Sequence, residues 1–563
     1  MNGEVRSAGL ETTEWWKGGL IYQIYVRSFF DSNDDGIGDL QGVIAKLDYL
    51  QELGVDGIWL SPITVSANAD WGYDVIDYYN VDPDLGTLED FDQLIAEAHS
   101  RSIKVITDFV PNHTSTKHPW FQNALTGRGA TYRDWYIWAD PKYGRRPPSN
   151  WRSAFGGGAW KYHPSTKQYY LHNFLTDQAD LNWRNPKVRQ EFEKIMKFWF
   201  GRGVDGFRID VFNMLIKDDR FRDNPGVRDN DGLEVKLLGQ RPVYNISRPE
   251  LHDILKSWRD IAESYKEHKL LLGESTLLYN VRQLASYYGS HDELQLAFNL
   301  MFIHTPFRAK DLRRVVERTE AAIVAPDWPV WTGSNHDQPR FPSRWAAGDP
   351  RRARLALMML LTLRGTPVLY YGDEIGLVNT NVPPWKLKDP VGRRLWPIYP
   401  GRDRARTPMP WADVAGGGFT DPDVTPWLPF GDLNKYSVGT QWQLKDSTWN
   451  FTRDLVALRR RLPDLQTGRY GSLSVAPNVW AWERGKATKV VLNMSSQPQD
   501  INGLVGQVEI GTNRQRDGEI ITQHLYLEPW EGVVLTAVPG AKTGKQPASK
   551  AKLKVSRSKS RHR

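Results

Sequence analysis

Two charged residues interrupt an otherwise apolar stretch, GVDGFRIDVF, at positions 203–212. The uncharged residues there are mostly β-branched or aromatic, which is typical of a strand buried on both faces. Arg208 and Asp210 are two residues apart, so their side chains leave the same face of a strand. A guanidinium beside a carboxylate in an apolar setting indicates either a structural ion pair or a group that takes part in chemistry. For an isolated pair the structural case is commoner, so the rest of the chain has to decide.

Three carboxylates stand where apolar segments end. Asp210 ends the first stretch, Glu274 ends KLLLGES, and Asp337 ends VWTGSNHD. Because active sites of β/α barrels gather at the carboxyl ends of the strands, we expect these three side chains to lie on one rim. Two carboxyl groups held in different environments can act as acid and as nucleophile in the same site.

Short apolar strands alternate with helical segments along most of the chain, which predicts parallel βαβ units. Eight strand segments can be counted, and they are LIYQIYV, GVDGIWLSP, IKVITDFV, the stretch ending at Asp210, KLLLGES, ELQLAFN, VWTGSNHD and TPVLYYGDE. Eight strand and helix pairs predict the α/β class and a closed (β/α)8 TIM barrel.

The alternation is interrupted between the third and fourth strands. We expect a catalytic barrel at 15–109 and 180–463, with an inserted subdomain at 110–179 that is rich in Trp, Tyr, Gly and Pro. Alternating strands such as VWAWERG then predict an antiparallel C-terminal β-sandwich domain at 464–540.

Composition and charge argue against nucleic-acid and membrane partners. The chain has 563 residues, no cysteine and a net charge of +7, and its last segment, 541–563, holds six Lys and three Arg without an acid. Subtracting those nine charges leaves the body at −2, so the basic pI belongs to a tail that we expect to be disordered rather than to a nucleic-acid site. No secretory leader or membrane span is evident. We expect a cytoplasmic protein, a monomer or homodimer without nucleic-acid or membrane partners.

The motifs DFVPNH, GFRIDV, LLGES and SNHD resemble the four signature regions of the α-amylase superfamily, glycoside hydrolase family 13. GIWLSP, QADLNW and GTPVLYYGDEIG resemble three further family regions, so the resemblance runs from about Trp15 to the end of the β domain. DSNDDGIGDL, WGYDVIDY, FGGGAW, YYLHNFL and GRDRARTPMPW are most similar to the oligo-1,6-glucosidase and α-glucosidase branch. The resemblance implies an exo-acting retaining α-glucosidase that takes small α-glucoside substrates and needs no organic cofactor.

The resemblance also implies residue roles. Asp210 would be the nucleophile, kept ionised by Arg208, and Glu274 the acid and then the base, while Asp337 would bind sugar hydroxyls. The pocket that accepts a terminal glucose would be closed by Asp74 and Arg402. The remaining substrate-binding positions implied are Tyr73, His113, Phe155, Phe174, Arg208, Val211 and His336.

Linkage preference follows from one position. In the family, the residue after the nucleophile tends to be Val in α-1,6-acting members and Thr in α-1,4-acting members. Val211 therefore predicts isomaltose-type substrates, with α-1,4 linkages as a further possibility.

The loop DSNDDGIGD places oxygen-bearing side chains at alternate positions around a turn glycine, which resembles the first half of a calcium loop. The resemblance implies a structural Ca²⁺ or Mg²⁺ here. Its ligands would be Asp31, Asn33, Asp35, the Ile37 carbonyl and Asp39. A polar turn without metal is the alternative.

Two other functions stay open. A glucosyl transferase or isomerase of the same superfamily, such as a trehalose-forming or sucrose-converting enzyme, would pass the glucosyl group to a sugar instead of water. A non-catalytic barrel is the second alternative, and it is disfavoured because all three carboxylates are present.

Overall fold

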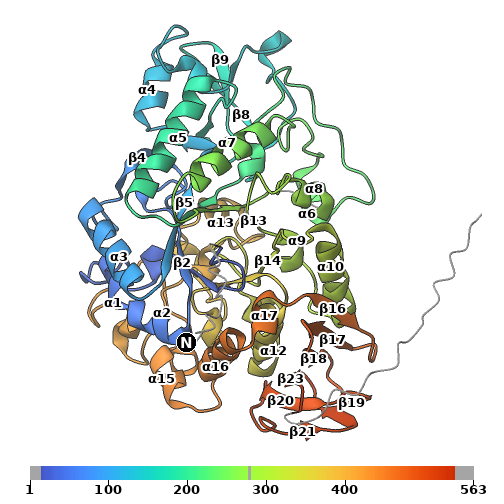
Figure 1. Cartoon of the computed structure of the whole chain (residues 1–563). Helices are drawn as coiled ribbons and strands as arrows, with labels where there is room; N and C mark the ends of the chain where they lie inside the picture. Colours follow the sequence, from blue (N-terminus) through green and yellow to red (C-terminus); the bar gives the residue numbers. More distant parts are fainter. Residues whose placement is uncertain (1–13, 277–279, 539–563) are drawn as a thin grey trace, which may run out of the picture.

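Eight parallel strands close into a barrel in the computed structural model, which describes residues 14–276 and 280–538 (Figure 1). The strands are β1 (Ile21–Ile24), β2 (Gly57–Leu60), β5 (Lys104–Phe109), β11 (Gly206–Ile209), β12 (Leu270–Gly273), β13 (Leu296–Ala297), β14 (Val330–Thr332) and β15 (Thr366–Tyr370). Their order in the sheet is β13-β12-β11-β5-β2-β1-β15-β14. A parallel bridge from Phe298 to Val330 joins the two ends, so the predicted (β/α)8 barrel is confirmed.

Large apolar side chains fill the barrel interior below its rim. They form one cluster that includes Ile21, Trp59, Ile106, Leu272 and Val330. The strand register places Arg208 on β11 beside Asp108 on β5 and Leu272 on β12. Because side chains alternate along a strand, Arg208 therefore points into the barrel just above this apolar layer.

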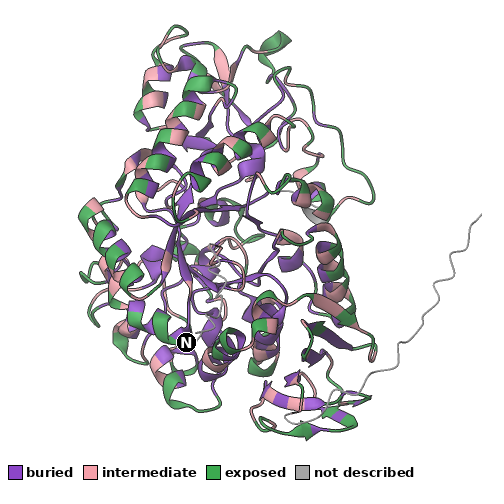
Figure 2. Cartoon of the chain, viewed as in Figure 1, coloured by how far each residue is buried: buried purple, intermediate pink, exposed green. Residues whose placement is uncertain are grey.

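Helices surround the barrel, with buried residues on the faces towards the strands and exposed residues on the outer faces (Figure 2). The principal ones are α1 (Leu40–Ala45), α2 (Leu47–Leu53), α3 (Leu88–Ser100), α5 (Pro186–Gly201), α7 (Leu251–Glu263), α8 (Val281–Ser286), α10 (Ala309–Ala322), α12 (Pro350–Thr362) and α16 (Thr448–Arg461). Helix α3 begins at a capping box, in which Thr87 and Asp90 bond each other's backbone N–H. None of the helices in the described ranges is long and apolar enough to cross a membrane.

The segment after β5 forms a small layer at one end of the barrel (Figure 1). It contains β6 (His113–Ser115), α4 (Pro119–Leu125), β7 (Trp138–Ala139), β8 (Trp160–His163), β9 (Gln168–Leu171) and β10 (Gln178–Asp180). Strands β7, β9 and β8 make one antiparallel sheet, and β10 returns to pair with β6 beside the barrel. The inserted segment therefore begins and ends next to β5.

An antiparallel C-terminal domain follows α16. Its strands are β16 (Tyr470–Leu473), β17 (Val479–Arg484), β18 (Thr488–Asn493), β19 (Gln499–Asn502), β20 (Gly506–Gly511), β21 (Ile520–Ile521), β22 (His524–Leu527) and β23 (Gly532–Thr536). Six of them form one sheet, and β19 pairs with β22 over a shared apolar core. The predicted basic tail at 541–563 lies outside the described residues.

A buried lysine ties the inserted segment to the barrel. Lys217 Nζ lies 2.6 Å from Asp180 Oδ2, at the end of β10, and donates to Asn112 Oδ1 at 2.8 Å, just after β5. Both charged side chains are almost fully buried. Burial lowers the pKa of Lys217, although the pair with Asp180 opposes that effect. The ammonium group thus fixes the end of the insertion against a strand that carries Asp108.

We expect Lys217→Met to destabilise the fold strongly, because it leaves the Asp180 carboxylate buried without its counter-charge. Breaking such a pair on one side costs about 3–5 kcal/mol. Thermal and urea unfolding measure the loss, with Lys445→Met at an exposed position as control. The double variant Lys217→Met with Asp180→Asn should recover part of the loss. A single variant no less stable than the control would contradict the assigned role.

Candidate active site

One guanidinium group holds three carboxyl groups at the carboxyl end of the barrel. Arg208 Nη1 donates to Asp210 Oδ1 at 2.8 Å and to Asp108 Oδ1 at 2.7 Å, and Nη2 contacts Glu274 Oε2. Asp210 and Glu274 also hydrogen-bond to each other. The side chain of Arg208 is only 1% exposed, and the three carboxyl groups are buried around it. The structure therefore brings together the two carboxyl groups that the sequence placed after neighbouring strands.

The backbone next to Asp210 is strained. Val211 has a φ of 34° and a ψ of 42°, a left-handed conformation that is unfavourable for a β-branched residue. Its side chain is buried against Met214, Ile246 and Phe174. Strain of this kind persists where the surrounding structure over-determines it, and it is frequent at functional sites.

Asp337 lies on the same rim under two arginines. Its Oδ1 accepts from Arg402 Nη1 at 3.1 Å and from Arg406 Nη2 at 3.0 Å, while Oδ2 lies 3.1 Å from His336 Nε2. The side chain is 29% exposed, more than that of Asp210 or Glu274. Asp337 is thus the carboxylate of the cluster that faces solvent.

A chain of side-chain contacts joins the carboxyl groups around Arg208 to Asp337. Tyr73 Oη lies 3.0 Å from Asp108 Oδ2 and 2.6 Å from His336 Nε2, and the two rings stack at 5.2 Å. Gln23 Nε2 donates to His336 Nδ1 at 2.8 Å, which places the ring proton of the neutral tautomer on Nε2. Burial lowers the pKa of His336 to about 4, so the ring is neutral at pH 7.

Aromatic rings form a wall beside these groups. The Arg402 guanidinium lies 5.0 Å from the ring centre of Phe155, which meets Phe174 edge-on at 5.4 Å. Phe174 in turn lies 5.2 Å from His113, whose Nε2 donates to the Tyr73 carbonyl at 2.9 Å. The predicted substrate-binding residues thus form one contact network, with one exception.

The exception is Asp74, which the structure places away from Arg402. Asp74 is fully buried in its own turn, where it accepts from the backbone N–H groups of Ala69 and Asp70 and from the Ser66 hydroxyl. Arg402 Nη2 instead lies 2.5 Å from Asp70 Oδ1. Asp70, and not Asp74, is therefore the residue of this turn that contacts Arg402.

Asp70, Asp389 and Arg406 were not predicted. Arg402 Nη2 also pairs with Asp389 Oδ1 at 2.8 Å, so this guanidinium is shared by three carboxylates like that of Arg208. Asp70 comes three residues before Tyr73, and Arg406 comes four residues after Arg402. These short spacings from predicted residues are the signal that could have identified two of the three.

The charged groups differ in proton affinity. Burial raises the pKa of Asp210 well above its usual value and also raises that of Glu274, in both cases against the opposing effect of Arg208. At Asp337 the effect of burial is outweighed by the contact with His336 and by the two arginines, which hold its pKa well below the usual range. We infer that Asp337 is ionised at neutral pH, while Asp210 and Glu274 titrate as a pair.

This differs from the expectation that Arg208 keeps Asp210 ionised. Arg208 does lower the pKa of Asp210, but the guanidinium is shared with Asp108 and Glu274, whose charges raise it. One positive charge is shared by three buried carboxylates, so its lowering effect on the pKa of Asp210 is outweighed by burial and by the neighbouring negative charges.

The loop predicted to bind a metal precedes α1. Asp31 Oδ2 accepts from the Gly36 N–H and the Thr420 hydroxyl, both at 2.7 Å, and Asp39 caps α1 by accepting from the Gly42 N–H. Asn33 and Asp35 each accept from the backbone N–H two residues further on. In the described residues, no group of three or more His, Cys, Asp or Glu could hold a metal ion. In this arrangement the side-chain oxygens of the loop accept hydrogen bonds from protein donors.

Comparisons with known proteins bear on the chemistry of this site. The sequence profile described as the α-amylase catalytic domain matches residues 23–468. A probable α-glucosidase of Rhizobium meliloti is 38% identical, with 86% of this chain and 90% of the relative covered. An oligo-1,6-glucosidase of Parageobacillus thermoglucosidasius is 35% identical, with 92% and 98% covered. Among solved structures, an α-glucosyl transfer enzyme superposes with a TM-score of 0.87 at 38% identity, covering 93% of this chain and 99% of that one.

We expect Glu274→Gln to stabilise the folded protein at pH 7, by roughly 1 kcal/mol or more, because it removes one of three carboxyl groups around a single guanidinium. The raised pKa means that the folded wild type binds a proton more tightly than the unfolded chain does. Wild-type stability therefore falls as pH rises through the folded pKa, and the advantage of the variant should shrink towards pH 4. Urea unfolding at pH 4 to 8 measures it, with Glu267→Gln as an exposed control. A variant less stable than wild type at pH 7 would contradict the charge assignment.

Proposed function

Because the chain belongs to the α-amylase family, glycoside hydrolase family 13, we propose that it is an exo-acting retaining α-glucosidase that releases glucose from short α-glucosides. It is a glycoside hydrolase, and its relatives named α-glucosidase and oligo-1,6-glucosidase define the branch. The finer assignments of roles, linkage and metal are our proposals.

The contact of Asp210 and Glu274 with the same guanidinium supports this function most strongly. Retaining glycosidases need two carboxyl groups about 5 Å apart, whereas inverting enzymes separate them by about 6.5–9.5 Å to admit a water. Two carboxyl groups that hydrogen-bond to each other meet the shorter requirement. The raised pKa of both groups also favours retention of the proton that the first step consumes.

In the proposed first step, an Asp210 oxygen attacks the anomeric carbon while Glu274 gives its proton to the glycosidic oxygen, which leaves with the rest of the substrate. In the second step, Glu274 takes a proton from water, and the resulting hydroxide displaces Asp210 from the sugar. Two inversions release α-glucose and restore both carboxyl groups. Asp337, held ionised by Arg402 and Arg406, would accept hydrogen bonds from the glucose hydroxyls.

The ion pair of Arg402 with Asp70 supports an exo mode of action. It joins the segment after β15 to the loop before Tyr73, and so it would close the site beyond the terminal glucose. Phe155 packs on the same guanidinium and would form the wall of this closed end. We therefore propose Asp70, in place of Asp74, as the partner of Arg402 in substrate binding.

A glucosyl transferase is the second candidate, favoured by the similarity to an α-glucosyl transfer enzyme. Both activities use the same first step and differ in whether water or a sugar hydroxyl resolves the intermediate. A non-catalytic barrel is disfavoured because Asp210, Glu274 and Asp337 lie together on one rim. Cytoplasmic location and a monomeric or homodimeric state remain predictions.

We expect Asp210→Ala to lower kcat on isomaltose by well over tenfold, because no covalent intermediate can form. Asp70→Ala should lower kcat/KM at least tenfold by freeing Arg402, while Asp74→Ala, its matched neighbour, should mainly lower the melting temperature. Steady-state kinetics and thermal unfolding of the three variants separate these effects. Full activity of Asp210→Ala would overturn the proposed function. A larger activity loss in Asp74→Ala than in Asp70→Ala would instead assign closure of the pocket to Asp74.

We expect a higher kcat/KM on isomaltose than on maltose, since Val211 occupies the position after the proposed nucleophile. Val211→Thr should shift the ratio towards maltose by several-fold. A panel of isomaltose, maltose, panose, nigerose, trehalose and sucrose, followed by NMR, gives linkage, anomer and transfer products together. Much faster hydrolysis of maltose by the wild type would contradict the linkage proposal.

A structural Ca²⁺ or Mg²⁺ in the loop of residues 31–39 also stays a prediction. If it is bound, a chelator should lower the melting temperature by several degrees, and Asp31→Asn should abolish that response. Ca²⁺ added back should restore the wild type. An unchanged melting temperature would mean that the hydrogen bonds within the loop hold it without metal.

A further inference from the structure

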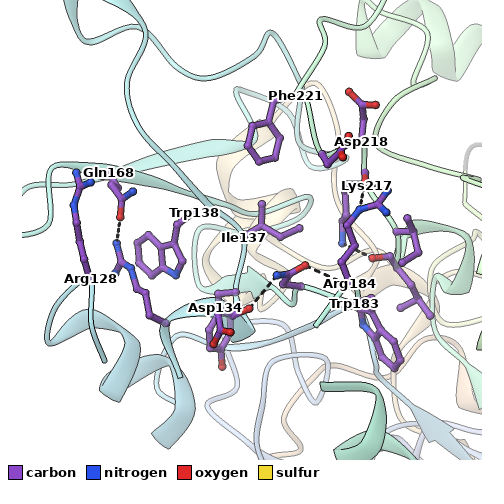
Figure 3. A pocket seen from close by; sticks show the side chains of 16 residues that line it. Arg128, Asp134, Ile137, Trp138, Gln168, Trp183, Arg184, Lys217, Asp218 and Phe221 are labelled. Carbon is purple, nitrogen blue, oxygen red and sulfur yellow. Dashed lines mark hydrogen bonds between the residues drawn. The ribbon is translucent and has the colours of Figure 1, made fainter. Parts of the chain in front are cut away.

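A cavity of ≈420 Å³ opens between the inserted segment and the chain that follows β11 (Figure 3). Its lining residues include Ile137, Trp138, Asn182, Arg184, Asp219 and Phe221. None of Asp210, Glu274 and Asp337 lines it, so it is separate from the charged cluster. The volume falls in the range of about 300–1,000 Å³ that small-molecule sites occupy.

One side of the cavity is apolar and held in place. Phe221 is half-buried, and edge-on contacts from Trp151 at 5.9 Å and Trp160 at 5.2 Å fix its ring. Its backbone is left-handed, with a φ of 48°, which is unfavourable for a bulky residue. Ile137, also half-buried, lines the same cavity. A flat apolar ligand face would find a preformed surface here.

The opposite side holds hydrogen-bond donors without acceptors. In the described part of the chain, neither the indole Nε1 of Trp138 nor the Nε of Arg133 has a partner, although both atoms are buried. The Arg133 guanidinium lies 3.3 Å from the Trp138 ring centre and donates to Gln168 Oε1 at 2.6 Å, which fixes both side chains. Both donor atoms lie beneath the surface, so Trp138 and Arg133 act as a rigid part of the cavity wall and not as donors to a ligand.

The charges at the cavity favour a neutral ligand. Lys217, Arg184 and Arg128 are already paired with Asp180, Glu250 and Asp140. Asp134 and Asp219, both exposed at the rim, form no ion pair with the residues described. Arg133 also lines the cavity and forms no ion pair with the residues described, so the unpaired charges are two carboxylates and one guanidinium. Their sum disfavours an anion, and the carboxylates accept hydrogen bonds from hydroxyl groups.

A sugar meets all these conditions at once. Its C–H face suits the ring of Phe221, and its hydroxyls can donate to the exposed carboxylates of Asp134 and Asp219. We propose that this cavity is a second saccharide-binding site, for an α-glucoside of one or two glucose units. The choice of an α-glucoside rests on the proposed function, whereas the preference for a neutral polyol rests on the cavity alone.

The position of the cavity links it to the catalytic rim. Its lining residues 215–219 follow directly after the 3₁₀ helix η4 (Phe212–Met214), which itself follows Asp210 and Val211. Asn182 comes two residues after Asp180, the partner of Lys217. A bound sugar would therefore contact both sides of the seam that Lys217 closes.

Binding stoichiometry tests the proposal in the full-length chain carrying Asp210→Ala, which cannot turn over. Calorimetric and NMR titration with isomaltose should give two sites. Adding Asp134→Ala and Asp219→Ala should weaken one of them at least tenfold, and adding Ile137→Trp, which fills the cavity, should abolish it. Adding Arg220→Ala, an exposed neighbour of Asp219 outside the lining, should change neither.

A single site in the Asp210→Ala protein, or a second site unaffected by the cavity variants, would overturn the proposal. The exposed pair Asp134 and Asp219 keeps the test decisive if Ile137→Trp does not fold. A wild type that hydrolyses isomaltose but has one binding site refutes the second site only. A chain that hydrolyses no α-glucoside, yet binds isomaltose in a manner sensitive to the cavity variants, refutes the proposed function only.

Discussion

The charged rim depends on the placement of one buried guanidinium. Arg208 enters the barrel from β11 above an apolar layer, beside Asp108 in the strand register. Its guanidinium forms ion pairs with Asp108, Asp210 and Glu274 at the same time. A single cation cannot neutralise three buried carboxylates, and this imbalance together with burial raises the pKa of Asp210 and of Glu274. The same imbalance is what acid catalysis at neutral pH requires.

A second buried guanidinium in the site is also shared by several carboxylates, but the effect on the pKa is different. Arg402 is shared by Asp70, Asp337 and Asp389, but Arg406 adds a second positive charge beside Asp337. The pKa of Asp337 is therefore held low, while those of Asp210 and Glu274 are raised. Lys217 is a further buried cation and fixes the insertion that carries His113 and Phe174. The cations thus set the charge of the site and its shape together.

Much of the fold could be predicted from local sequence. The eight barrel strands are short β-branched or aromatic segments bounded by helices, and both properties are local. The helical segment between Leu40 and Leu53 is interrupted at Lys46, whose φ of −110° separates α1 from α2. Lys46 Nζ lies over the rings of Phe30 and Trp411, a contact with a residue far along the chain that no local pattern reveals.

Site residues could be predicted where a sequence motif identifies them. They could not be predicted where only contact with another residue of the folded chain does. Asp210 and Glu274 come directly after β11 and β12, and Asp337 lies five residues after β14, so counting strands places all three on one rim. Asp70 and Asp74 stand four residues apart in the same turn, and only the direction of each side chain separates them: one faces Arg402, and the other accepts hydrogen bonds within the turn. The contact of Tyr73 with His336 likewise joins residues 263 positions apart. Such pairings belong to the closed barrel and not to any segment.

Trapping the glycosyl-enzyme tests the central claim most directly. A fluorinated α-glucosyl fluoride, which forms the covalent intermediate but slows its hydrolysis, should add one fluoroglucosyl group to the intact protein. Peptide mass spectrometry should place that group on Asp210, and Asp210→Ala should take up none. A label on another carboxylate, or release of inverted β-glucose by an unlabelled enzyme, would contradict the assignment of Asp210 and Glu274 to a double-displacement mechanism.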